Sequence, residues 1–155
     1  MKVCIRHVDG HAFMAKSDSN HWIPFDTGVP SGGSGAANDP VQLFIIACGG
    51  CVSIDVVNFL KKSRKDVTLY ELDLEATRAE TQPRIVRALS FNAKVNGENI
   101  SEDLVKRALE LSLTKYCSVS LSLDRSVIFK ARVTLNGVRG ELFEIPRDAA
   151  LYDRQ

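Results

Sequence analysis

A long apolar segment constrains the fold of this chain more than any other feature. It follows Asp39-Pro40, where aspartate is a favourable N-cap and proline is well tolerated at the first helical position. From Val41 to Lys62 apolar residues dominate, which predicts a helix of about 22 residues and roughly 33 Å. Because residues 43–48 are apolar all round, we expect this helix to be buried at the centre of the fold.

The sequence argues against membranes and nucleic acids as partners. Asp55 and Asn58 interrupt the apolar segment, which falls short of the roughly 18 consecutive apolar residues of a membrane span. The net charge is +1, and no basic stripe is present. The first residues, MKVCIRHVDGHAF, lack the apolar stretch of about 7–15 residues that a signal peptide needs, so we expect a cytoplasmic protein.

Length and cysteine content favour a globular protein with free thiols. A chain of 155 residues, 45% of them apolar, can build a core without disulfides or a structural metal. Four cysteines in a cytosolic chain of this size are more typical of core thiols, metal ligands or redox residues than of structural disulfides.

Strand patterns surround the long helix. The first forty residues predict short strands over residues 3–7, 13–15 and 21–25. Asp9-Gly10 supplies a hairpin turn between the first two, and Pro24 limits the third to a sheet edge. Residues 26–39 are rich in Gly, Ser, Asp and Pro and predict a loop, which is either functional or a plain connection.

The second half of the chain continues with strands and a second helix. Alternating apolar residues predict strands over residues 70–76, 85–95 and 127–135. Ser101 can cap a helix whose first turn holds Glu102 and Asp103, and residues 118–123 are a candidate short helix. Because strands cluster and show one polar face, we expect an α+β fold with an antiparallel sheet.

Cys48-x-x-Cys51 lies within the long helix and admits three interpretations. It could be a redox motif, although such motifs normally begin a helix; a zinc site, although no second matched pair exists; or two buried core residues. We favour the core interpretation for Cys48. Gly49-Gly50 costs about 1 kcal/mol per residue relative to alanine, which indicates close approach by another helix or backbone, or space beside Cys51.

Two cysteine motifs resemble those of a known family. The stretch DPVQLFIIACGGCVSIDVV around Cys51 resembles the central helix of the OsmC/Ohr family, the osmotically inducible protein C and organic hydroperoxide resistance proteins. Lys115-Tyr116-Cys117-Ser118-Val119-Ser120 is similar to the second cysteine motif of that family. Gly-Gly-Cys before Ile-Asp-Val-Val best matches the OsmC-like subgroup. The resemblance predicts one OsmC-like domain over residues 1–135 and a C-terminal extension over residues 136–155.

The resemblance implies a fold and an activity. Family members are intertwined homodimers with the active site at the subunit interface. Cys51 would be the peroxidatic residue that attacks an organic hydroperoxide, and Cys117 the resolving residue that forms a disulfide with it. A cellular dithiol would then reduce that disulfide. Neither a cofactor nor a metal is implied.

The family activates its thiol with an arginine that a glutamate holds, and this chain departs from that pattern. The position that matches the glutamate is Val41, whose neighbour is Gln42, and Arg6 or His7 is the candidate cation. Cys48 is a further auxiliary candidate. These departures motivate an alternative function, a redox-sensing or small-ligand-binding protein with weak or no catalysis.

Overall fold

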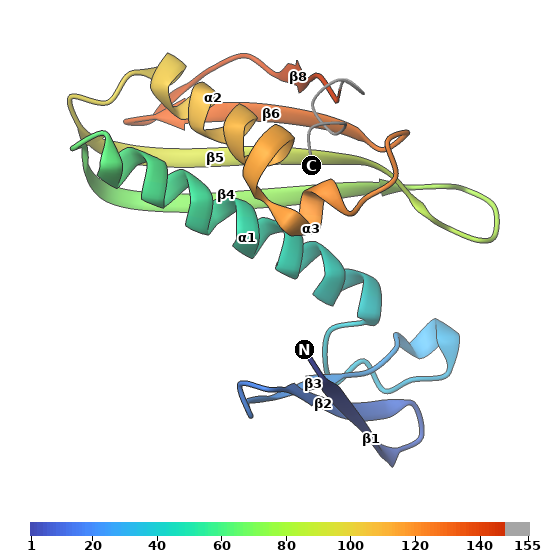
Figure 1. Cartoon of the computed structure of the whole chain (residues 1–155). Helices are drawn as coiled ribbons and strands as arrows, with labels where there is room; N and C mark the ends of the chain where they lie inside the picture. The colour runs from blue at the N-terminus through green and yellow to red at the C-terminus, as the bar shows by residue number, and fades with distance from the viewer. Residues whose placement is uncertain (148–155) are drawn as a thin grey trace. The chain divides into compact units, whose positions relative to one another are not determined.

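The computed structural model describes residues 1–147 (Figure 1). They divide into two compact units, Met1–Ile46 and the part of the chain from Ala47 onwards. The long helix α1, Pro40–Lys62, crosses this boundary, so its first turns belong to the first unit and Cys51 to the second. The observed bounds of α1 confirm the central helix predicted from the sequence.

The first unit contains a three-stranded antiparallel sheet in the order β1-β2-β3. Its strands are β1 (Val3–Asp9), β2 (Ala12–Ser17) and β3 (Trp22–Phe25). Gly10, with φ of 51°, makes the predicted turn between β1 and β2. Pro24 lies in β3 at the edge of the sheet, as predicted, because proline cannot donate to a neighbouring strand.

Asp26 organises the loop that follows β3. Its buried carboxylate accepts hydrogen bonds from Thr27 N (2.7 Å), Ser34 N (3.0 Å), Ser34 Oγ (2.5 Å) and Ala36 N (3.4 Å). One short 3-10 turn, η1 (Val29–Ser31), lies within the loop. The segment predicted as a loop is therefore irregular but tightly hydrogen-bonded.

The sheet of the second unit is mixed rather than purely antiparallel. Its strands are β4 (Asp66–Arg78), β5 (Val86–Glu98), β6 (Ile128–Leu135), β7 (Val138–Arg139) and β8 (Phe143–Ile145). β4 and β5 form an antiparallel hairpin, whereas β5 and β6 are parallel. The prediction of an antiparallel sheet is wrong for this pair because the helical segment between β5 and β6 returns the chain to the end where β5 began.

That helical segment has three parts. The predicted second helix is α2 (Glu102–Leu111), and Ser101 caps it by accepting a hydrogen bond from Leu104 N at 3.3 Å. A π-helical turn, η2 (Ser112–Tyr116), continues α2, and the predicted short helix follows as α3 (Ser118–Leu121). Cys117 lies between η2 and α3.

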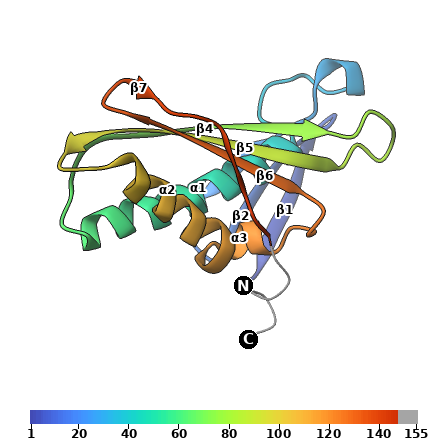
Figure 2. The same ribbon diagram turned by 90° about the horizontal axis from the view of Figure 1, so that it is seen from above.

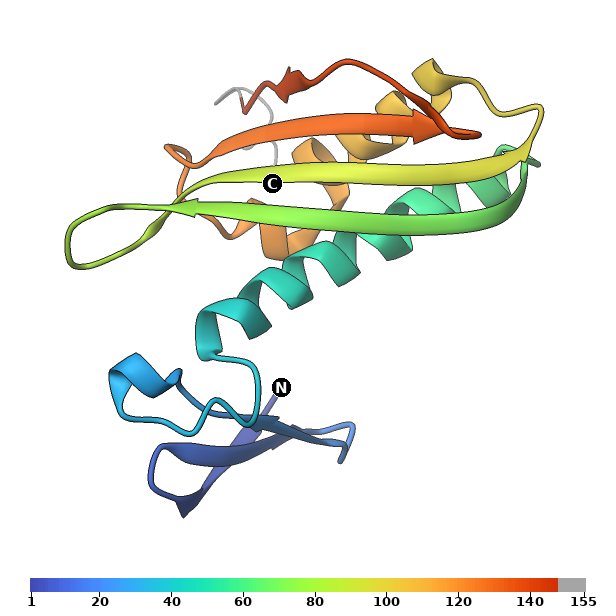
Figure 3. The same ribbon diagram turned by 180° about the vertical axis from the view of Figure 1, so that it is seen from behind.

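The core of the second unit lies between the sheet and its helices. α2 and the part of α1 from Ala47 onwards cover one face of the sheet (Figures 2 and 3). The buried stripe of α1 consists of Cys48, Val52, Val56 and Leu60. From the strands, Phe91 and Phe129 meet edge to face with their ring centroids 5.6 Å apart.

Burial of α1 is confined to that stripe, so the expectation of a helix buried on all sides is wrong for the single chain. Ile46 is 56% exposed and Ile54 is 64% exposed. By length and composition alone, α1 is apolar enough to cross a membrane, a property that it shares with core helices of soluble proteins. An exposed apolar helix side of this kind is typical of a contact surface.

The glycine pair in α1 has a partly different environment from the one expected. A Cβ at Gly49 would lie 3.4 Å from a methyl of Leu74 and 3.7 Å from one of Leu72, whereas Gly50 faces open space. The neighbours of Gly49 are therefore side chains of β4 rather than another helix or backbone.

Part of the C-terminal extension joins the sheet. β7 and β8 both pair with β6. Residues 148–155 of the predicted extension lie outside the described residues. The boundary at residue 135 stays a prediction.

Protonation of Asp26 should loosen its loop. Hydrogen bonds, the largest from the Ser34 side chain, lower the pKa of Asp26 from 3.8 to about 2, against the opposing effect of burial. A carboxylate with a lowered folded pKa stabilises the loop above pH 4, and this stabilisation is lost as the pH falls from about 4 to about 2. The amide resonances of Thr27 and Ser34 should report this transition in NMR spectra.

Asp26→Asn should abolish the transition, whereas Asp18→Asn, which changes an exposed acid of the same unit, should leave it in place. A transition centred at the ordinary aspartate pKa would contradict the prediction.

Candidate active site

Cys51 lies on α1 at the margin of the buried stripe. Its side chain is partly exposed, whereas the preceding Cys48 and the following Val52 are fully buried. Asp55 is one helical turn further along and partly exposed as well. Because residues four apart lie on one helix face, Cys51 and Asp55 point in the same direction.

Cys117 approaches this face from the second helical segment. It is fully buried and forms the N-cap of α3, where its Sγ accepts a hydrogen bond from Ser120 N at 3.4 Å. Ser120 Oγ donates in return to the carbonyl of Cys117 at 3.1 Å. Two bonds within one turn therefore hold the sulfur in place.

The two predicted site cysteines meet in the structure. The sulfurs of Cys51 and Cys117 and a carboxylate oxygen of Asp55 all lie within 4.8 Å of one another. Ser112, fully buried at the start of η2, donates from its Oγ to Asp55 Oδ2 at 2.8 Å. The hydroxyl thus fixes the carboxylate beside the two sulfurs.

The thiols differ in how readily they ionise. Burial raises the pKa of Cys117, and a hydrogen bond with Cys51 raises it further, so this thiol keeps its proton. Burial raises the pKa of Cys48 to about 12, with a smaller contribution from the nearby sulfurs. Cys48 does not belong to the close cluster, which agrees with its interpretation as a core residue.

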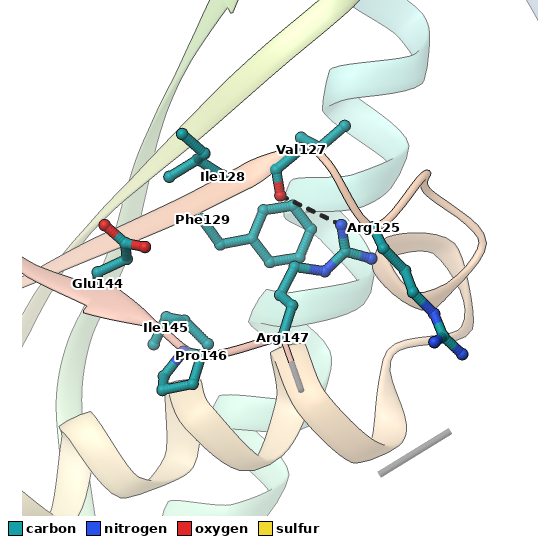
Figure 4. A pocket seen from close by; sticks show the side chains of 8 residues that line it. All are labelled: Arg125, Val127, Ile128, Phe129, Glu144, Ile145, Pro146 and Arg147. Atoms are coloured by element: carbon teal, nitrogen blue, oxygen red, sulfur yellow. Dashed lines mark hydrogen bonds between the residues drawn. The ribbon is translucent and has the colours of Figure 1, made fainter. Parts of the chain in front are cut away.

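Arg147 supports the turn that carries Cys117. Its guanidinium lies over the Phe129 ring, 4.3 Å from the centroid (Figure 4). It donates to the carbonyls of Ser120 (3.3 Å), Leu123 (3.0 Å), Asp124 (2.5 Å) and Val127 (3.2 Å). A single side chain next to β8 therefore ties together carbonyls of α3 and of the segment that follows it.

A cavity of about 400 Å³ opens beside the cluster. Its lining consists of polar Asp55, Asn58, Lys62 and Ser112 together with Phe59, Ala108, Leu111 and Tyr116. The cavity therefore gives a small molecule access to the carboxylate side of the thiol pair.

The three auxiliary candidates of the N-terminal region belong to the first unit. The Arg6 guanidinium lies 5.3 Å from the centroid of the Trp22 ring, and His7 Nε2 hydrogen-bonds to the carbonyl of Gly10 at 3.0 Å. Gln42 accepts from Asp39 N and donates its own backbone N–H to Asp39 Oδ1, each at 2.8 Å, so it caps α1. Their roles as auxiliaries to Cys51 stay predictions.

Sequence reasoning missed Asp55, Ser112 and Arg147 as parts of the site. The i, i+4 spacing from Cys51 to Asp55 could have indicated the first. Ser112 and Arg147 act through contacts with residues far away in the sequence, and nothing in their local sequence indicates them.

Both site cysteines lie in a part of the chain that is similar to known proteins. A family model described as OsmC-like protein matches residues 32–132, a range that contains both site cysteines. Protein YhfA of Escherichia coli (strain K12) is 38% identical over 128 residues, which cover 82% of this chain and 92% of that protein. The chain belongs to the OsmC-like family.

Solved structures agree with the OsmC-like fold. An OsmC-like protein from Mycoplasma pneumoniae is 14% identical, with a TM-score of 0.72, over 86% of this chain and 95% of that one. An organic hydroperoxide resistance protein OsmC from Legionella pneumophila is 14% identical, with a TM-score of 0.62, over 86% and 96%. The predicted OsmC-like α+β fold is therefore confirmed.

The thiols should differ in reactivity towards an alkylating agent. With a pKa of about 12, Cys48 is ionised in about one molecule in ten thousand at pH 8, and it is buried. We expect iodoacetamide to modify exposed Cys4 and partly exposed Cys51 in the native protein well before Cys48 and Cys117. Peptide mapping by mass spectrometry over time measures this order.

Unfolding in denaturant should equalise the four rates. Rapid native-state modification of Cys48 would contradict its place in the core.

Proposed function

We propose that this protein reduces organic hydroperoxides with Cys51 as the peroxidatic and Cys117 as the resolving residue. The observation that carries the proposal is the approach of the two sulfurs, one partly exposed on α1 and one buried before α3. An accessible sulfur can meet a peroxide, and a buried one next to it can resolve the product.

The reaction has two chemical steps in the protein. The Cys51 thiolate attacks one peroxide oxygen, the O–O bond breaks, and the alkoxide leaves and is protonated to an alcohol. The resulting sulfenic acid condenses with the Cys117 thiol, which forms a disulfide and releases water. A dithiol reductant then exchanges with the disulfide and restores both thiols.

The environment of the pair suits an organic peroxide. The cavity beside Asp55 has apolar walls from Phe59, Leu111 and Tyr116 that can bind the organic group of a substrate. The Legionella pneumophila relative is described as an organic hydroperoxide resistance protein. A reducing compartment such as the cytoplasm would keep both thiols available for turnover.

Loss of Cys51 should abolish peroxide reduction. We expect Cys51→Ser to lower the turnover of cumene hydroperoxide with a dithiol reductant at least about a thousandfold, as for loss of a catalytic nucleophile. Cys117→Ser should instead accumulate a sulfenic acid at Cys51 that dimedone traps, because the resolving thiol is absent. Consumption of peroxide and intact-protein mass spectrometry measure the two results.

Cys48→Ser is the matched control, because it changes a thiol on the same helix that lies outside the cluster. It should keep most of the activity. Unchanged turnover in Cys51→Ser would refute the mechanism.

We also propose that two chains associate through α1. Its exposed apolar residues Ile46 and Ile54 would then be buried against the second copy. The helix would thus be buried in the dimer, as its apolar sequence predicts. The family resemblance implies such a homodimer.

A charge on this side of α1 should weaken the dimer. Ile54→Asp places a carboxylate where an apolar side chain is 64% exposed in the single chain, so burial against a partner becomes unfavourable. Sedimentation equilibrium should therefore show a dissociation constant at least about tenfold higher than that of the wild type, as each 1.4 kcal/mol gives a factor of ten.

Val138→Asp is the control, since Val138 is 72% exposed on β7, which is at the opposite end of the strand order from β4. A monomeric wild type, or equal effects of the two substitutions, would contradict the prediction.

The second candidate function is a redox sensor or small-ligand-binding protein on the same site. It is favoured by one observation: a carboxylate oxygen of Asp55 lies within 4.8 Å of both sulfurs. A carboxylate supplies no positive charge to activate a thiol, so turnover that depends on such activation would be slow. Stoichiometric oxidation of the pair without multiple turnovers would support this function over catalysis.

A further inference from the structure

Cys51, Asp55 and Cys117 also form a set of metal ligands. Within residues 1–147, their two sulfurs and one carboxylate oxygen make up a group of ligand atoms that all lie within 4.8 Å of one another. We propose that the reduced protein binds one thiophilic divalent cation, such as Zn²⁺, through these three atoms. The proposal is separate from peroxide reduction and needs no step of that reaction.

The spacing of the ligand atoms suits a tetrahedral ion. Zinc lies about 2.3 Å from a thiolate sulfur and about 2.0–2.2 Å from a carboxylate oxygen, so two sulfurs on one ion are about 3.8 Å apart. The cluster lies within 4.8 Å, so small rotations of the side chains bring the atoms to these separations.

The ligands come from two rigid elements. Cys51 and Asp55 are four residues apart on α1 and therefore share one face of the helix. Cys117 is held from the other side by its place between η2 and α3. The arrangement is therefore set by helix packing rather than by a flexible loop.

Two further hydrogen bonds resemble the outer shell of a metal site. Ser112 Oγ donates to Asp55 Oδ2 at 2.8 Å, which leaves the second carboxylate oxygen for an ion. Ser120 N donates to Cys117 Sγ at 3.4 Å. Hydrogen bonds to ligating carboxylates and sulfurs orient them and tune the bound metal.

The cavity of about 400 Å³ supplies an entry path and room for a fourth ligand. Asp55 and Ser112 line its wall, so an ion at the cluster would be reached from this side. Zinc sites with three protein ligands bind an exchangeable water or small molecule at the fourth position.

Charge and ligand type favour a thiophilic ion over a hard one. With both thiols deprotonated, the three ligands would carry three negative charges, and among residues 47–147 Asp55 forms no salt bridge with a lysine or arginine. A divalent cation neutralises most of that charge. Thiolates select zinc-type ions, whereas magnesium and calcium prefer all-oxygen sites.

Metal binding and oxidation should exclude each other. Binding displaces the two thiol protons and uses both sulfurs as thiolates. Disulfide formation takes two electrons from the same sulfurs and joins them, so the ion loses two of its three ligands and dissociates.

The test is titration of the reduced, metal-free full-length protein with Zn²⁺ in isothermal calorimetry. We expect one equivalent to bind, with release of protons. Cys51→Ser, Cys117→Ser and Asp55→Asn should each weaken binding at least about tenfold, the lower end of the losses seen when residues of metal sites are changed. Cys4→Ser and Cys48→Ser should bind as the wild type does, since both remove a thiol outside the cluster.

Cobalt provides a second readout that does not depend on affinity. Co²⁺ in this site should give thiolate-to-metal charge-transfer and tetrahedral d–d absorption bands, and oxidation of the two thiols to a disulfide should abolish them. Circular dichroism confirms that each variant is folded. Absence of stoichiometric binding, or binding equally strong in Cys51→Ser and Cys117→Ser, overturns the proposal.

The two proposals fail separately. Peroxide turnover without zinc binding overturns the metal site and leaves the proposed function in place. Zinc binding without turnover supports the metal site and counts against the peroxidase.

Discussion

Packing of one stripe of α1 against the sheet determines which residues of this helix face the core and which lie at its margin. The stripe from Cys48 to Leu60 recurs every four residues, so its burial sets the rotation of the helix about its axis. Cys51 and Asp55 each precede a stripe residue by one position, which places them about 100° around the helix, at the margin of the core. A partly exposed thiol with a carboxylate beside it is therefore a consequence of helix periodicity and core packing.

The second sulfur depends on the crossover between β5 and β6. Because these strands are parallel, the chain must cross the sheet, and α2 does so on the face that α1 also covers. The π-helical turn η2 then ends the crossover helix, and insertions of this kind are frequent at functional sites. Ser112 begins that turn and hydrogen-bonds to Asp55, so the turn that presents Cys117 also positions the carboxylate.

Local sequence signals predict much of this structure. The remaining features depend on contacts between segments that are far apart in the sequence. The helix after Asp39, the cap at Ser101 and the alternating strands follow from periodicity and capping, and the structure confirms them. The parallel pairing of β5 and β6 has no local signal, because alternation is the same in either direction. Likewise, the sequence motifs indicate the two cysteines. The partners of Arg147 are backbone carbonyls, which every residue has, so the sequence does not indicate them.

Asp55 links the two chemistries proposed for this site. The Asp55 carboxylate adds one negative charge beside two sulfurs that can each carry another, and protons or a cation can balance that charge. Without a cation, burial keeps the proton on Cys117, and this thiol can resolve a sulfenic acid on Cys51. When a cation balances the charge, both sulfurs become thiolates and neither is free to react. The same three side chains would therefore leave the Cys117 thiol available to resolve oxidised Cys51 in the absence of metal, and would hold both sulfurs as metal ligands in its presence.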